Sequence, residues 1–133
     1  MPYLDIADYG VIGDLRTVAL VGVDGSIDWC CFPRFDGPSL FGAILDDARG
    51  GRFRVGVKGA PRGNQRYMPD TGVLQTEFTT PGGSAVVTDF MPVAAAGAAP
   101  HRPRAGRRRS RCPRGFPLRS AARRRRPRPS SFA

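Results

Sequence analysis

The stretch that decides the fold runs from Gly22 to Phe41 and reads GVDGSIDWCCFPRFDGPSLF. Its Asp24-Gly25 pair lies between two apolar runs, and Asp-Gly is the strongest short signal for a hairpin because glycine accepts the positive φ of a tight turn. The sequence therefore predicts a strand over Thr17–Val21 and a return strand over Ser26–Phe32. Proline cannot donate a hydrogen bond to a sheet, so Pro33 is expected to end the return strand.

Side chains alternate between the two faces of a strand. Strict alternation places Ile27, Trp29 and Cys31 on one face of the return strand, with Asp28 and Cys30 on the other. Beyond the loop that follows, Ser39 is a plausible N-cap, and the apolar spacing predicts one short helix over Leu40–Asp46.

The remainder of the first 95 residues contains β signals. RFRVGV (Arg52–Val57) alternates cleanly, and Val73–Thr80 and Ser84–Phe90 predict a second hairpin across a Pro-Gly-Gly turn. We expect an irregular lead-in over Tyr3–Asp14, because Gly10 and Gly13 interrupt it. The expected fold is mainly β, a partial β-sandwich with one short helix.

The charge divides the chain in two. Residues 1–99 contain eight basic and eleven acidic side chains, whereas residues 100–133 contain thirteen arginines and no acidic residue. A segment with few apolar residues and one sign of charge cannot offset the entropy of ordering. We therefore expect an incomplete β-sandwich domain over residues 1–95 and a disordered Arg/Pro-rich tail over residues 96–133. The composition of that tail is typical of GC-rich DNA translated in a shifted reading frame.

Several classes of protein are disfavoured. No apolar run is long enough to cross a bilayer, and the acidic start does not resemble a secretory signal, so we expect a cytoplasmic protein without membrane association. The single histidine, His101, lies in the tail, and no paired Cys-x-x-Cys spacing exists. We expect neither a metal nor a cofactor, and Cys30 and Cys31 are interpreted as packing thiols.

One loop could contact a ligand. Trp29, the only tryptophan, is followed closely by Arg34, Phe35 and Asp36. An aromatic face beside Arg and Asp can stack on a sugar ring and bind its hydroxyl groups. Composition alone favours the simpler interpretation, a packed tryptophan with an Arg–Asp pair that holds the loop.

Two longer blocks carry a resemblance. DYGVIGDLRTVALVGVDGSIDW, continuing through CCFPRFDGPSLFGAILDDARGGRFRV, and then RYMPDTGVLQTEF with VVTDFMPV, resemble the start of bacterial family-15 glycoside hydrolases, the glucoamylase-like and trehalase-like proteins. The resemblance covers about residues 3–93. It implies an N-terminal β-sandwich of the super-sandwich type, followed in the family by a helical barrel that hydrolyses α-glucosides such as trehalose or α-glucan ends.

The family's inverting chemistry uses two glutamates. This chain has one, Glu77, so we expect a non-catalytic fragment that is inactive alone, with Trp29, Arg34, Phe35 and Asp36 supporting a sugar site in the parent enzyme. Two other interpretations remain open: a protein that binds nucleic acid or another polyanion through its arginine tail, and a carbohydrate-binding module without catalysis.

Overall fold

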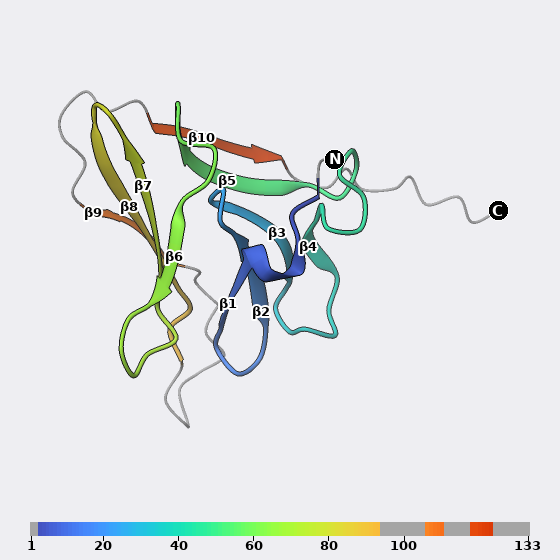
Figure 1. Cartoon of the computed structure of the whole chain (residues 1–133). Helices are drawn as coiled ribbons and strands as arrows, with labels where there is room; N and C mark the ends of the chain where they lie inside the picture. The colour runs from blue at the N-terminus through green and yellow to red at the C-terminus, as the bar shows by residue number, and fades with distance from the viewer. Residues whose placement is uncertain (1–2, 94–105, 111–117, 124–133) are drawn as a thin grey trace.

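The structure is a computed structural model that describes residues 3–93, 106–110 and 118–123 of the chain (Figure 1). Two antiparallel sheets make up the described part. The six-stranded sheet contains β1 (Tyr9–Gly13), β2 (Val18–Gly22), β3 (Ser26–Cys31), β4 (Ser39–Gly42), β5 (Arg52–Val57) and β10 (Leu118–Arg123). The four-stranded sheet contains β6 (Asn64–Tyr67), β7 (Leu74–Thr80), β8 (Gly83–Phe90) and β9 (Gly106–Ser110). The predicted mainly β fold is confirmed.

The hydrophobic core lies between the two sheets. One cluster joins Ile12, Val21 and Ile27 of the six-stranded sheet to Leu74 of β7. A second cluster joins Val55 of β5 and its neighbours to Phe78, which is fully buried on β7. Leu74, Thr76 and Phe78 all face inward, as the period-two pattern of this strand predicts. The two sheets therefore share one continuous interior, as in a β-sandwich.

Two glycines let the backbone approach its neighbours closely. Gly25 in the predicted Asp-Gly turn has φ +79°, and a Cβ there would lie 2.0 Å from the carbonyl oxygen of Val55. Gly10 lies inside β1, where a Cβ would come within 2.5 Å of a Leu74 methyl group. Gly10 does not interrupt β1. Because it has no side chain, it allows β1 to pack closely against β7.

The irregular lead-in expected over Tyr3–Asp14 is wrong. A short 3₁₀ helix, η1 (Ile6–Asp8), leads into strand β1, which pairs with β2 from Tyr9↔Gly22 to Gly13↔Val18. Pairing with β2 satisfies the backbone groups of a segment in which Gly10 and Gly13 disfavour a strand, so the neighbouring strand overrides the effect of the two glycines.

The predicted helix over Leu40–Asp46 is also wrong. Ser39–Gly42 forms β4, which pairs with β3 through Trp29↔Gly42 and Cys30↔Phe41. A turn follows, in which the N–H groups of Leu45 and Asp46 donate to the carbonyl of Gly42. Leu45 is 77% exposed, so the apolar face that the helix would have buried does not form. The edge of β3 offers these residues backbone partners that a short isolated helix lacks.

We expected disorder throughout residues 96–133. Two segments of that range are strands instead. β9 pairs with the edge of β8, and β10 pairs with β5 from Leu118↔Val57 to Arg123↔Arg52. The rest of the range lies outside the described residues, and the frameshift origin of the tail stays a prediction, as does the domain boundary at residue 95.

Candidate functional site

Strand β3 changes partners halfway along its length. Its first residues, Ser26 and Ile27, pair with β5, and its later residues pair with β4. On its other side, Val21 of β2 pairs with Ile27 and Leu20 pairs with Trp29, so Asp28 is the extra residue of a β-bulge. The carbonyl of Asp28 accepts a hydrogen bond from the N–H of Ile44 instead. The bulge and the change of partners therefore coincide at Asp28.

The bulge shifts the alternation of side chains along β3. Ile27 and Cys30 both belong to the core cluster, although strict alternation placed them on opposite faces, so that prediction is wrong. Trp29 pairs with Leu20, while Cys30 pairs with Ala19 of the core. Because one inserted residue reverses the alternation beyond it, Trp29 lies on the face directed away from the core and is half-buried.

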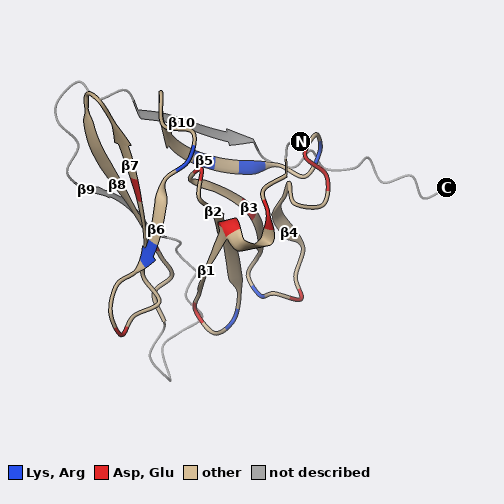
Figure 2. Cartoon of the chain, in the orientation of Figure 1, with Lys and Arg blue, Asp and Glu red and all other residues tan. Residues whose placement is uncertain are grey.

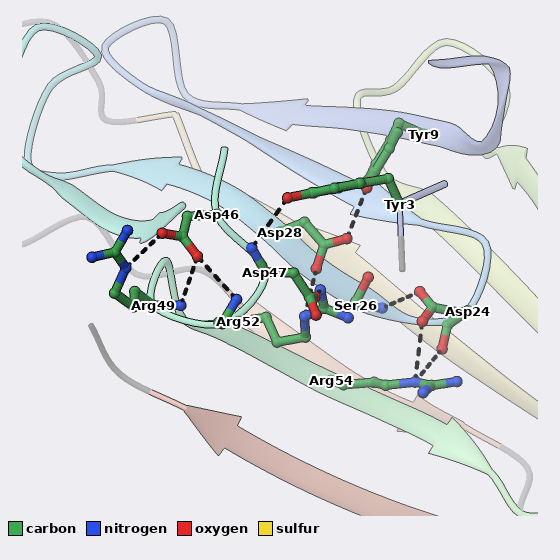
Figure 3. Close-up of polar contacts among 11 residues, drawn as sticks. Tyr3, Tyr9, Asp24, Ser26, Asp28, Asp46, Asp47, Arg49, Arg52 and Arg54 are labelled. Atoms are coloured by element: carbon green, nitrogen blue, oxygen red, sulfur yellow. Dashed lines mark hydrogen bonds and ion pairs between the residues drawn. The ribbon is translucent and has the colours of Figure 1, made fainter. Parts of the chain in front are cut away.

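A polar network surrounds Asp28 on that outer face (Figure 3). Asp28 Oδ2 accepts a hydrogen bond of 2.8 Å from the Tyr9 hydroxyl, and Oδ1 lies 3.4 Å from Arg52 Nε. Arg52 also contacts Asp47, which places the guanidinium group between two carboxylates. The side chain of Asp28 is only 5% exposed, so a buried charge is balanced by a half-buried one.

Two polar atoms of the network have no hydrogen-bond partner among the described residues. They are Asp28 Oδ1 and Ser26 Oγ, and both are buried. Arg52 and Asp28 are therefore close enough to form an ion pair, but their geometry does not meet the criteria for a hydrogen bond. Next to it, Arg54 Nε lies 3.2 Å from Asp24 Oδ2 and donates to the Asp24 carbonyl, while Asp24 Oδ1 accepts from Ser26 N–H. These contacts hold the hairpin turn against β5.

The pKa values of Tyr9 and Cys30 are raised by burial. Burial raises the pKa of the Tyr9 hydroxyl well above its ordinary value, and the hydrogen bond to Asp28 and the charges of Asp28 and Asp24 add to the effect against the opposing Arg52. Burial, with smaller contributions from Cys31 and Asp14, raises the pKa of the Cys30 thiol to about 11. A neutral, buried thiol is a poor nucleophile, which agrees with a packing role for Cys30.

The four predicted site residues occupy two places. Arg34 Nε lies 3.2 Å from Asp36 Oδ1, with side chains 68% and 62% exposed, on the loop between β3 and β4. Phe35 between them is 63% exposed. Trp29 lies within β3, where it pairs with Leu20 and Gly42. The structure therefore brings together Arg34 and Asp36, and it places the tryptophan on the strand before their loop.

Sequence reasoning missed Tyr9 and Arg52 as partners of Asp28, and it missed Asp47 as the second carboxylate beside Arg52. The alternation of RFRVGV correctly directs Arg52 away from the core, but its partners come from segments far apart in sequence, and no local pattern links them. The described residues contain no group of three or more His, Cys, Asp or Glu side chains arranged to hold a metal ion. Glu77 lies half-buried on β7, between the inward-facing Thr76 and Phe78.

A family model described as trehalase-like, N-terminal, matches residues 4–104. The chain belongs to this family. The match agrees with the resemblance to trehalase-like proteins in the sequence.

Three trehalases are similar to the chain, and each similarity covers 68% of it. A trehalase of Mycolicibacterium smegmatis is 42% identical over 91 residues, which are 14% of that protein. A trehalase of Mycobacterium tuberculosis is 40% identical over 91 residues, 13% of its length, and one of Thermoplasma volcanium is 40% identical over 93 residues, 15% of its length. The chain therefore spans only a small part of the curated relatives it matches.

No solved structure matches the chain. Among the residues that the structure describes, no helix has the length and apolar character needed to span a membrane.

Replacing Asp28 tests the network. We expect Asp28→Asn to lower the free energy of unfolding by about 1–3 kcal/mol, because the charged partner of the Tyr9 hydroxyl and of Arg52 is lost. The matched control is Asp36→Asn on the exposed loop, where the expected loss is about 0–1 kcal/mol. Urea denaturation followed by the fluorescence of Trp29 measures both. Equal losses in the two variants would contradict the structural role of Asp28.

The raised pKa of Tyr9 leads us to expect that stability depends on pH in the alkaline range. Its folded pKa is raised above the unfolded value of about 10, so its contribution to stability is complete below pH 10 and is lost as the pH rises further. We expect stability to fall more steeply above pH 10 in the wild type than in Tyr9→Phe. Denaturation curves collected between pH 8 and pH 11.5 measure the difference, and parallel profiles would contradict the raised pKa.

Proposed function

We propose that this chain is the N-terminal, non-catalytic β-domain of an α-glucoside hydrolase of the trehalase type. The membership of residues 4–104 in the trehalase-like N-terminal family carries the proposal. The identity of about 40% to three trehalases supports trehalose or a related α-glucoside as the substrate of the complete enzyme. The helical barrel of family-15 hydrolases, as the resemblance implies, would supply the catalytic groups.

The carboxylates of this chain support the assignment of chemistry to another part of the enzyme. Inverting hydrolysis needs one carboxyl group as acid and a second as base across a water molecule. The best-buried aspartate of the polar network, Asp28, is held by Tyr9 and Arg52, and the only glutamate, Glu77, lies on the opposite sheet. Neither belongs to an arrangement of two free carboxyl groups around a common space. The cytoplasmic location expected from the sequence stays a prediction.

The part of the domain proposed to support the sugar site is the loop after β3, with Arg34, Phe35 and Asp36, together with Trp29 on β3 itself. Arg34 and Asp36 present an exposed pair of hydrogen-bonding groups, and Phe35 presents an aromatic ring beside them. Sugar recognition combines such an aromatic face with charged hydrogen-bonding partners. Exposure of all three side chains leaves them free to contact a substrate held by another domain.

A chimeric enzyme tests the domain assignment. The residues of this chain that align with the Mycolicibacterium smegmatis trehalase replace their 91 counterparts in that enzyme. We expect the chimera to release glucose from trehalose and the separate chain to release none above a buffer blank, because the catalytic groups lie in the other part of the enzyme. A coupled glucose assay measures both. Hydrolysis by the separate chain, or an inactive chimera, would contradict the proposal.

The loop is tested in the same chimera. We expect Arg34→Ala and Asp36→Ala each to raise the KM for trehalose about tenfold or more while kcat changes little, as for loss of a charged hydrogen bond to bound substrate. Arg49→Ala is the matched control, because Arg49 forms a comparably exposed pair with Asp46 at 2.8 Å. An unchanged KM in the loop variants would remove Arg34 and Asp36 from the sugar site.

A further inference from the structure

Two loops lie together at one end of the six-stranded sheet. The turn between β1 and β2 contains Asp14, Leu15 and Arg16, and the loop between β3 and β4 contains Arg34, Phe35 and Asp36. The N–H of Phe35 donates a 2.9 Å hydrogen bond to the carbonyl of Arg16, which joins the two loops. Both project from the same end of the sheet in Figure 1. We call these six residues the loop tip.

The loop tip exposes two large apolar side chains. Leu15 is 91% exposed and Phe35 is 63% exposed. A single exposed apolar residue is ordinary on a protein surface, but here two lie on loops that a backbone hydrogen bond joins. Figure 2 shows basic and acidic residues along both loops. Exposed apolar side chains with polar and charged neighbours are typical of residues that take part in a protein interface.

The backbone of Leu15 is held in an unfavourable conformation. Its φ is +70°, in the left-handed region that a branched, non-glycine residue rarely adopts. Asp14 maintains this turn, since its Oδ1 accepts hydrogen bonds of 2.9 Å from the N–H groups of both Arg16 and Thr17. The turn thus keeps a strained backbone and leaves the leucine in solvent, without any gain in core packing. Strain of this kind often marks a functional position.

We propose that the loop tip docks against the catalytic part of the trehalase-type enzyme, with Leu15 and Phe35 as its apolar contacts. This inference rests on the proposed function. The length of the relatives supports this occupant, because the matched residues are 14% of the Mycolicibacterium smegmatis trehalase and therefore adjoin a much larger body. Two side chains offer too little area for a stable dimer of free chains, whereas a contact within one polypeptide benefits from a high effective concentration.

Hydrogen–deuterium exchange in the chimera described above tests the docking. We expect peptides that contain residues 14–17 and 33–37 to exchange at least about tenfold more slowly in the chimera than in the separate chain, because the docked loops open less often. The double variant Leu15→Ser/Phe35→Ser should lose this protection. Ile6→Ser is the matched control, since Ile6 is 92% exposed but lies on η1, outside the loop tip, and the control should keep the protection.

The outcomes separate the two proposals. Equal exchange of the loop peptides in an active chimera and in the separate chain overturns the docking but leaves the proposed function intact. An inactive chimera overturns the proposed function and, with it, this inference. Sedimentation equilibrium of the separate chain provides a further check: a dimer that Leu15→Ser/Phe35→Ser dissociates would assign the loop tip to a second copy of this chain and overturn docking to the catalytic part.

Discussion

The change of partners along β3 at Asp28 is the constraint on which the six-stranded sheet depends. β3 must pair with β2 along one edge while its other edge is shared by β5 and then β4. A bulge absorbs the mismatch by inserting Asp28, and the ion pair with Arg52 ties the inserted residue to β5. The Tyr9 hydroxyl ties it to β1 at the same time. One carboxylate therefore links three strands where the regular ladder is interrupted.

The bulge also affects which side chains of β3 lie on the apolar inner face of the sheet and which lie on its charged outer face. Ile27 and Cys30 enter the core on either side of the inserted residue, so the inner face stays apolar across the change of partners. The outer face receives Asp28 together with the arginines of β5, and these charges neutralise one another at its surface (Figure 3). The outer network thus stabilises the fold, and the loop tip carries exposed side chains that can contact a ligand or another domain.

The sequence predicted the fold class well because local signals and burial agree in most strands. The apolar residues of Arg52–Val57 alternate in the sequence over the residues that form β5, and the Asp-Gly turn has the positive φ that glycine accepts. The predictions failed at Leu40–Asp46 and at Tyr3–Asp14. Each segment contains glycine, which disfavours a strand, and a neighbouring strand decides the structure of the segment by providing backbone partners. No pattern within these segments reports the presence of that partner.

In the candidate site, too, some features follow from the sequence alone and others only from the tertiary structure. The sequence by itself determined the family, the mainly β character, the single glutamate and the loop that carries Arg34, Phe35 and Asp36. Only the tertiary structure decided that Trp29 turns away from the core, that Asp28 meets Tyr9 and Arg52, and that Leu15 lies beside the Phe35 loop. The physical reason is that a bulge and a change of strand partners depend on contacts between segments that are distant in sequence. Hydrophobic alternation and turn-forming residues, in contrast, can be recognised from neighbouring residues alone.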